Sequence, residues 1–303
     1  KERLGKDSVV TDARLTGYEL TDTGVVAEFV SADGTTNSVT GNLLIGADGI
    51  HSQVRQQMHP NQGPPNWGGA VMWRGVSLGK PTRTRNSFVL MGSMEQRFVC
   101  YPISKPDPET GLSLINWIAE LTLETHASAT QSDWNSSANI DDFIDAFTHW
   151  QFTWLDVPAL INASDAVYEY PMVDRDPVDF WVDQRVVLIG DAAHAMYPVG
   201  SNGASQGIVD ARILGAKLKS HGLTLEALTA YETEVLAPVN ELILRNRGAG
   251  PIGILGVIED RAPFNKIDEV ISTEEVSEFM SAYKKAAGFA LNALNTSPQT
   301  IGD

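Results

Sequence analysis

Cysteine and long apolar runs are scarce in this chain of 303 residues. The single cysteine, Cys100, excludes an internal disulfide and favours a reducing, cytoplasmic location. Because it lies in the strand-like run RFVCYPI, we expect a core residue rather than a nucleophile. No apolar run approaches the roughly 20 residues that a membrane helix needs, and no signal peptide opens the sequence. The sequence therefore predicts a protein without a membrane anchor.

Basic residues are also few, because 22 lysines and arginines stand against 38 acidic residues, for a net charge of −16. This charge repels phosphates, so nucleic acid is not an expected partner. A small anionic ligand remains compatible, since local arginines act over a Debye length of roughly 8 Å. The six histidines show no metal-ligand spacing, and no metal site is predicted.

The predicted secondary-structure pattern changes three times along the chain. Residues 1–65 and 173–240 combine buried strands with helical patterns, whereas residues 66–172 contain alternating strands that predict a mostly antiparallel sheet. Within that stretch, residues 139–154 have helical spacing, and residues 241–303 are helical in part. The sequence predicts an α/β fold in which a Rossmann-like nucleotide-binding domain carries an inserted β-sheet domain, with C-terminal helices.

Two segments repeat the order strand, glycine and acid: LLIGADGIHSQVRQQM (43–58) and VVLIGDAAHAMYPVGSNGASQGIVDA (186–211). Asp48 and Asp191 follow the strands, Ser52 is placed to cap a short helix, and a longer helix begins near Ala204. Beyond the carboxyl ends of parallel strands, an acid can accept from sugar or ribityl hydroxyls, and a helix N-terminus favours negative charge. One such segment alone also fits a plain turn and cap; two flanking a sheet domain favour a ligand site.

The first segment resembles the DG motif, and the second the GD motif, of FAD-dependent aromatic-ring monooxygenases with the para-hydroxybenzoate hydroxylase fold. The stretches MHPNQGPPNWGGAVMWRGV, SLINWI and YPMVDRDP are similar to the phenazine-modifying, methylphenazine-carboxylate monooxygenase-like branch. The resemblance implies an FAD/NAD(P)-binding domain with an inserted substrate domain. It also implies FAD as cofactor, NADH or NADPH and molecular oxygen as co-substrates, and hydroxylation of an aromatic or heteroaromatic small molecule, phenazines included, through a flavin C4a-hydroperoxide.

The resemblance also assigns residues. Asp191 matches the acid that binds the ribityl chain, and Asp48 and Arg55 match positions linked to FAD and pyridine-nucleotide use. The loop and helix start that meet the flavin ring are Pro198, Gly200, Asn202, Gly203 and Ala204. His194 falls inside the motif, where many relatives use it structurally, and no catalytic residue is assigned.

Five residues are candidates for the substrate site: Tyr197, Trp73, Arg74, Tyr101 and Trp117. Tyr197 ranks first because it lies beside the flavin loop, and Arg74 is a candidate partner for a substrate carboxylate. The alternative for Arg74 is a solvated sheet arginine, and for the aromatics a place in the core. Residues 174–176 (Asp-Arg-Asp) are expected to form a surface ion cluster, with Arg175 as a further candidate for cofactor contact.

The family's G-x-G-x-x-G fingerprint has one literal match here, GAGPIG at residues 248–253. It follows a helix-like run rather than a strand and contains a proline, so we expect a helix C-cap and turn instead of a Rossmann loop. The opening KERLGKDSVV reads as the end of a helix entering a strand. We therefore expect that an N-terminal part of the FAD-binding domain, with its fingerprint, is missing from this sequence.

Three functional interpretations remain open. The first is the hydroxylase, and the second is a flavin oxidoreductase of the same fold that does not hydroxylate; a halogenase-type lysine beside a tryptophan-rich motif is not seen. The third is a fragment or interaction domain that binds no cofactor. The sequence leaves the choice between a monomer and a homodimer open, as well as that between NADH and NADPH.

Overall fold

The computed structural model describes residues 4–5, 8–124, 136–248 and 250–286. The chain divides into two compact units. The first, called the α/β unit, comprises Lys1–Asn66, Asp174–Gly250 and Met280–Asp303; the second, called the sheet unit, comprises Trp67–Val173 and Pro251–Phe279. Residues 251–279 thus group with the sheet, whereas the sequence prediction placed residues 241–303 together in one C-terminal region.

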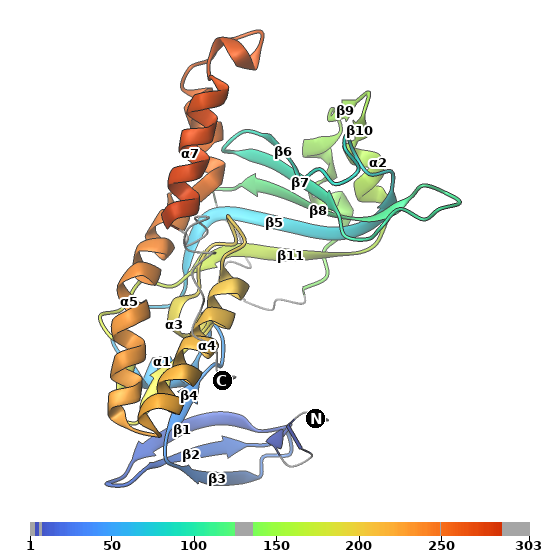
Figure 1. Ribbon diagram of the computed structural model, residues 1–303. Helices are drawn as coiled ribbons and strands as arrows, with labels where there is room; N and C mark the ends of the chain where they lie inside the picture. The colour runs from blue at the N-terminus through green and yellow to red at the C-terminus, as the bar shows by residue number, and fades with distance from the viewer. Residues whose placement is uncertain (1–3, 6–7, 125–135, 249, 287–303) are drawn as a thin grey trace. The chain divides into compact units, whose positions relative to one another are not determined.

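The α/β unit begins with a three-stranded antiparallel sheet in the order β1-β2-β3 (Figure 1). Its strands are β1 (Arg14–Leu20), β2 (Val25–Val30) and β3 (Thr36–Gly41). The N–H of Ser31 donates to the carbonyl of Thr35 at 2.9 Å, which closes the turn between β2 and β3. β2 and β3 thus form a hairpin with Ala32-Asp33-Gly34 in its turn.

A second small sheet brings the two sequence motifs together. Its order is β12-β13-β4, with β12 (Val182–Asp183), β13 (Val186–Leu188) and β4 (Leu44–Gly46). β13 runs parallel to β4 with Leu188 opposite Gly46, and the N–H of Ile189 donates to the carbonyl of Gly46 at 2.9 Å. Because the strands are parallel, the segments that follow them, with Asp48 and Asp191, leave the sheet at the same edge.

Four helices of the α/β unit follow from clear sequence signals: α1 (Gln53–Met58), α3 (Asp191–His194), α4 (Gly203–His221) and α5 (Leu225–Arg247). Ser52 caps α1 as predicted, and Thr224 caps α5. α4 and α5 pack side by side (Figure 1). Gly248 ends α5, its N–H donating to the carbonyl of Leu244 at 3.2 Å, so the expected C-cap at GAGPIG is confirmed.

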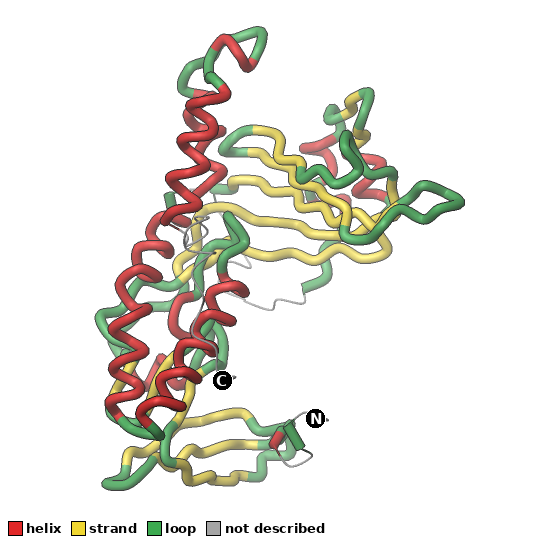
Figure 2. Tube along the Cα trace, viewed as in Figure 1, coloured by secondary structure: helices red, strands yellow, loops and turns green. Residues whose placement is uncertain are grey.

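The sheet unit contains a five-stranded sheet in the order β11-β5-β8-β7-β6 (Figure 2). The strands are β5 (Asn66–Gly79), β6 (Val89–Gly92), β7 (Gln96–Pro102), β8 (Ser113–Thr122) and β11 (Ser164–Asp174). β8 pairs antiparallel with both β5 and β7, and β7 with β6. This arrangement confirms the antiparallel sheet expected from the alternating sequence pattern.

One face of this sheet carries the core of the unit. Trp73 and Trp117 pack with Phe98, Phe143 and Phe147 in a single hydrophobic cluster. The helix predicted over residues 139–154 is wrong: two short 3₁₀ helices, η2 (Ile140–Asp142) and η3 (Ile144–Phe147), are followed by the hairpin β9 (Gln151–Phe152) and β10 (Leu155–Asp156), and then by α2 (Val157–Asn162). Phe143, between the two 3₁₀ helices, and Phe147, at the end of the second, are both buried in this core.

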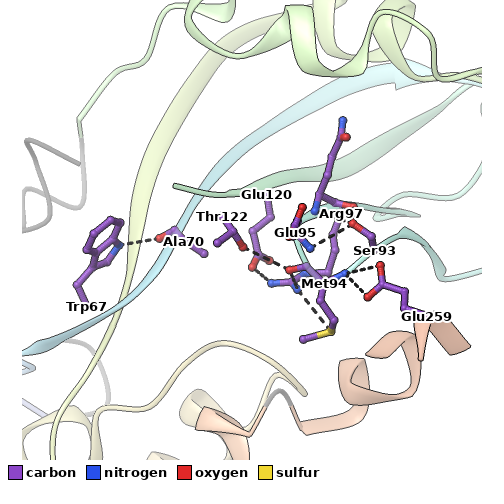
Figure 3. A network of polar contacts seen from close by, with 10 residues as sticks. Trp67, Ala70, Ser93, Met94, Glu95, Arg97, Glu120, Thr122 and Glu259 are labelled. Carbon is purple, nitrogen blue, oxygen red and sulfur yellow. Dashed lines mark hydrogen bonds and ion pairs between the residues drawn. The ribbon is translucent and has the colours of Figure 1, made fainter. Parts of the chain in front are cut away.

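A buried ion pair lies at the end of the sheet near the turn between β6 and β7 (Figure 3). Arg97 on β7 pairs with Glu120 on β8 and donates to the carbonyl of Met94 at 2.7 Å. Glu259, the last residue of α6 (Ile254–Glu259), accepts from the N–H of Met94 at 3.1 Å. These contacts connect the turn to the sheet and to α6 inside the sheet unit.

The C-terminal part of the described chain is helical, with η5 (Ile267–Glu269) and α7 (Thr273–Ala286). The helices expected in part of residues 241–303 are present among the described residues, and residues 287–303 lie outside the described residues. None of the described helices combines the length and the apolar character that crossing a bilayer requires.

Candidate functional site

The candidate site lies in the α/β unit, where the chain leaves β13. Asp191 is exposed, and no side chain or N–H of the described residues bonds to its carboxylate. A Cβ atom added to Gly203 would lie 4.0 Å from Oδ1 of Asp191. The carboxylate therefore lies beside the first turn of α4, as the sequence predicted from the two halves of the motif.

The N-terminal end of α4 carries no side-chain cap among the described residues, although α4 is a helix of 19 residues. Asn202 occupies the N-cap position, but its amide donates to the hydroxyl of Tyr283 instead of accepting from the helix. The first N–H groups of such a helix lack intrahelical partners and carry about half a positive charge. Gly200 and Ala204 are exposed beside this end. Together with the Asp191 carboxylate, the first N–H groups of α4 suit an anionic ring and a hydroxylated chain, as in the isoalloxazine ring and the ribityl chain of a reduced flavin.

A buried polar pair, His194 and Asp210, supports the segment that follows β13. Nε2 of His194 bonds to Oδ2 of Asp210, and neither side chain has exposed surface. Asp210 also accepts from the N–H of Gly190 at 2.9 Å and from Gln206 at 3.2 Å. His194 thus joins α3 to α4 and has no access to a ligand, in agreement with a structural role.

Arg55, predicted to contact the cofactor, is buried and acts on the loop through the backbone. It donates to the carbonyls of Ala192 and Ala193 in α3, to the carbonyl of Asp176 at 2.8 Å, and to Gln62 at 2.6 Å. Burial, with the nearby charge of Arg175, lowers the pKa of Arg55 to about 10, so it stays charged at neutral pH. Arg55 has only 2% of its surface exposed, and its observed role is to support α3. Its contact with a cofactor stays a prediction.

Asp48, the other predicted acid, caps α1. One carboxylate oxygen accepts from the hydroxyl of Ser52, and the other accepts from the N–H groups of Gln53 at 2.8 Å and Val54 at 3.2 Å. The carboxylate remains exposed while it makes these bonds. Its role toward a cofactor therefore stays a prediction, and its observed role is to fix the start of α1.

The acidic residues around Arg175 do not form the surface ion cluster expected from the sequence. Asp174 is fully buried and accepts two bonds from Arg247 at the end of α5, at 2.6 and 2.8 Å. Arg247 also pairs with Asp176 at 2.7 Å, and these two carboxylates raise the pKa of Arg247 above its ordinary value. Arg175 donates to the carbonyls of Ile50 and Gly63, so its role is to join backbone segments. The partner of Asp174 was not predicted, because 73 residues separate it from Arg247.

Tyr197 is half-buried in the α/β unit and directly precedes the loop at residues 198–203. Burial, and then the charge of Asp174, raises the pKa of Tyr197 to about 12, so its phenol stays protonated at neutral pH. Asn246 donates to the carbonyl of Tyr197 at 3.4 Å. The hydroxyl remains a candidate donor to a ligand.

The four candidates in the sheet unit fall on opposite faces of the sheet. Trp117 is fully buried and donates to the hydroxyls of Ser77 and Ser164, and Trp73 stacks on Phe143 with ring centroids 4.7 Å apart. Both tryptophans are core residues, which corrects their assignment to a substrate site. Their burial follows from the alternation of a strand, which places neighbouring side chains on opposite faces.

Arg74 and Tyr101 lie on the face away from that core. Arg74 is exposed and donates through Nε to Oδ1 of Asn116 at 2.8 Å. Tyr101 is opposite Asn116 in the register of β7 and β8, and it stacks on Phe88. The amide nitrogen of Asn116, Nδ2, is buried without a partner among the described residues. This face therefore offers a guanidinium, an amide and an aromatic ring.

The described residues contain no group of three metal-ligating side chains. Comparison with known proteins points instead to an organic cofactor. A family model described as "FAD binding domain" matches residues 1–245. The chain is 39% identical over 250 residues to a phenazine 1,6-dicarboxylic acid hydroxylase, PhzS, of Lysobacter antibioticus, covering 82% of this chain and 61% of the relative.

A second relative is 3-hydroxybenzoate 6-hydroxylase 1 of Aquipseudomonas alcaligenes, 30% identical over 232 residues, or 76% of this chain and 54% of the relative. The chain thus spans less than two thirds of the length of these curated relatives. Among solved structures, HpxO of Klebsiella pneumoniae complexed with FAD and uric acid has the same fold, with a TM-score of 0.67 at 22% identity over 94% of this chain and 65% of that one.

The family model covers more than half of the chain and includes both sequence motifs, the exposed Asp191 and the whole of α4. The chain belongs to the FAD-binding-domain family, that of the FAD-dependent aromatic-ring monooxygenases.

Proposed function

We propose that this chain is part of an FAD-dependent, NAD(P)H-consuming monooxygenase that hydroxylates an aromatic or heteroaromatic carboxylic acid, with phenazine carboxylic acids as the first class to test. The observation that carries the proposal is the exposed carboxylate of Asp191 beside the uncapped N-terminal end of α4. NADH or NADPH and molecular oxygen are the proposed co-substrates.

Bound FAD supplies the redox chemistry, by accepting a hydride and then reacting with oxygen. In the proposal, Asp191 accepts hydrogen bonds from ribityl hydroxyls. The N–H groups at the start of α4, from Gly203 onward, would hold the pyrimidine edge of the ring and would favour negative charge there. Such a helix end contributes typically about 0.3–1 kcal/mol, and more when partly buried. Arg55 and the His194–Asp210 pair hold α3 and α4 in place for these contacts.

Arg74 is the proposed anchor for the substrate carboxylate. Its Nε atom is engaged by Asn116, which orients the guanidinium and leaves the Nη groups available. A guanidinium binds a carboxylate with planar, charge-assisted hydrogen bonds. Tyr101, on the same sheet face, is the proposed aromatic contact of the sheet unit. Tyr197 is a separate candidate hydroxyl donor within the α/β unit.

The relatives support an aromatic acid as substrate class. Their names describe hydroxylation of phenazine 1,6-dicarboxylic acid and of 3-hydroxybenzoate, both of which carry carboxylates on an aromatic ring. The identity of 39% to the phenazine enzyme, against 30% to the benzoate enzyme, is the reason to test phenazines first.

The test uses the full-length protein, purified and reconstituted with FAD. The expected result is a flavin absorption spectrum, oxidation of NADH or NADPH that accelerates when a phenazine carboxylic acid is added, and a product heavier than the substrate by one oxygen atom. Product mass separates hydroxylation from the alternative, because a flavin oxidoreductase would oxidise NAD(P)H without adding oxygen to the substrate. Protein that binds no FAD under any condition would favour a cofactor-free domain instead.

A further inference from the structure

The hydroxyl of Tyr283 on α7 lies at the centre of a buried polar network in the α/β unit. It accepts from the amide Nδ2 of Asn202, and it lies 3.1 Å from Oδ1 of Asn246 and 3.4 Å from the carbonyl of Val199, both of which are acceptors. Asn202, Asn246 and Tyr283 are all buried. The network therefore joins the flavin loop to the end of α5 and to α7.

Two glycines shape the space around this tyrosine. Gly200 has φ +84°, and a Cβ atom there would overlap the Tyr283 hydroxyl oxygen. Gly250 has φ +48°, and its Cβ would lie 3.2 Å from the tyrosine ring. Both left-handed conformations suit glycine. The hydroxyl thus occupies the place that a side chain at position 200 would need.

Asn202 is diverted from capping by this contact. A residue at the N-cap normally accepts from the N–H groups of the first turn, but here its Nδ2 is bonded to Tyr283 and its Oδ1 is buried without a partner among the described residues. The first turn of α4 consequently keeps its N–H groups available. Neither Asn246 nor Tyr283 lies within residues 1–245, the part of the chain that matches the family model.

We propose that Tyr283 is a positioning residue for the flavin: by engaging Asn202 and the Val199–Gly200 segment, it keeps the N-terminal end of α4 uncapped and directed at the isoalloxazine ring. This inference rests on the proposed function, since it concerns the same FAD site. Burial raises the pKa of Tyr283, so the phenol stays neutral and retains its hydrogen as a donor to Asn246 or Val199. Without the hydroxyl, the Asn202 side chain is released to rotate and cap α4, in competition with the flavin.

The experiment compares FAD-bound full-length wild type with Tyr283→Phe, Asn202→Ala and the double variant. Affinity for FAD, the absorption spectrum and the reduction potential of the bound flavin are measured for each. Tyr283→Phe removes the hydroxyl that accepts from Asn202. Because one buried hydrogen bond is lost, FAD affinity is expected to fall by about threefold to tenfold. The potential is expected to become more negative, because the helix end then stabilises the added negative charge less. Tyr283→Phe frees the Asn202 side chain to cap α4, whereas Asn202→Ala removes the capping group itself. Asn202→Ala and the double variant should therefore keep an FAD affinity and a potential close to those of wild type, so the effects of the two substitutions should not be additive.

Tyr231→Phe is the matched control, because it removes another buried tyrosine hydroxyl, one that lies 3.4 Å from the carbonyl of Leu188 and away from the loop at residues 198–203. Its potential and FAD affinity are expected to stay within about twofold of wild type. A Tyr283→Phe protein with the wild-type spectrum, affinity and potential would overturn the proposal, even if it were less stable. Additive effects in the double variant would also overturn it.

Asn246→Ala is a second variant, which tests the role of Tyr283 if Tyr283→Phe does not fold. It removes an acceptor of the tyrosine hydroxyl while leaving the ring in place. We expect a more negative flavin potential here too, and an unchanged potential would contradict the proposal. Wild-type protein that never binds FAD would overturn both the function and this inference, whereas a yellow wild type with unaffected variants would overturn this inference alone.

Discussion

The side chains of His194 and Asp210 bond to one another without any exposed surface on either residue. The pair joins α3 to α4, and Asp210 also accepts from the N–H of Gly190. Three features of the loop, namely its entry at Gly190, the helix α3 and the helix α4, therefore depend on one carboxylate. The first prediction follows from this dependence.

Asp210→Ala is expected to lower the free energy of unfolding by about 3–5 kcal/mol, because it leaves the buried imidazole of His194 and the half-buried N–H of Gly190 without their acceptor. Urea unfolding of the two proteins measures the difference. Asp22→Ala, at an exposed turn position, is the control and should change stability by less than about 0.5 kcal/mol. A difference below about 1 kcal/mol for Asp210→Ala would contradict the structural role.

Asp191→Asn should weaken FAD binding by about tenfold or more without loss of stability, because the exposed carboxylate makes no bond within the described protein and a charged hydrogen bond contributes about 1.5–3 kcal/mol. Titration of the full-length apoprotein with FAD, followed by flavin fluorescence, gives the dissociation constants. Asp22→Asn, which removes the same charge elsewhere on the α/β unit, should bind FAD like wild type. Equal affinities in all three proteins would exclude Asp191 from the cofactor site.

Arg55→Lys should destabilise the protein by about 2–3 kcal/mol, although the charge is retained. A lysine cannot reproduce the planar fork that reaches the carbonyls of Ala192 and Asp176 together with Gln62. Denaturant unfolding measures the loss, and hydrogen exchange should show faster opening of residues 191–203. The exposed Arg14→Lys is the control. Wild-type stability in Arg55→Lys would mean that these backbone contacts contribute little.

Arg74→Ala should raise the KM for a carboxylated aromatic substrate by about tenfold to a hundredfold, since it removes charge-assisted bonds to the carboxylate. The same variant should leave the KM for the decarboxylated analogue nearly unchanged. Steady-state NAD(P)H oxidation with both compounds provides the comparison, and Arg85→Ala, at an exposed loop position of the sheet unit, is the control. If Arg74→Ala raised the KM for both compounds equally, the guanidinium would not be binding the carboxylate.

Burial raises the pKa of the Cys100 thiol to about 11, from an ordinary value of 9.0. The native protein should therefore not react with a thiol reagent at pH of about 8, whereas protein unfolded in urea should react at one site. Between these two pKa values the folded state keeps a proton that the unfolded state loses, so the free energy of unfolding should fall as pH rises through this window. Cys100→Ser provides the control for both measurements, and rapid labelling of the native protein would show that the core is open.

The end of the α/β unit where both motifs meet could be predicted because its signals are local. A buried strand, a glycine and an acid occur twice in the sequence, and parallel pairing of β4 with β13 brings them to one edge. The caps at Ser52 and Gly248 also depend only on nearby residues. What Arg55 and Asp174 contact could not be predicted, since their partners lie 137 and 73 residues away in the sequence.

The side chains on each face of the five-stranded sheet were predicted only in part, for a different reason. Trp73 and Arg74 are neighbours in a strand, so only one of them can lie on a given face, and the sequence does not say which face meets the core. The aromatic residues Phe143 and Phe147 had the spacing of an α-helix, yet their burial against the sheet is achieved by 3₁₀ turns. Both errors concern tertiary packing, which no local pattern encodes.

The parallel pairing of β4 with β13 has a consequence for how such proteins diversify. Three residues on each strand, aligned from Leu44 with Val186 to Gly46 with Leu188, bring together the two ends of a segment about 140 residues long, which contains most of the sheet unit. Within this segment, residues 67–173 belong to the sheet unit, whereas α1 with Arg55 belongs to the α/β unit. Insertions or deletions confined to residues 67–173 can therefore remodel the sheet without changing the residues of the two short strands or the Arg55 contacts with α3.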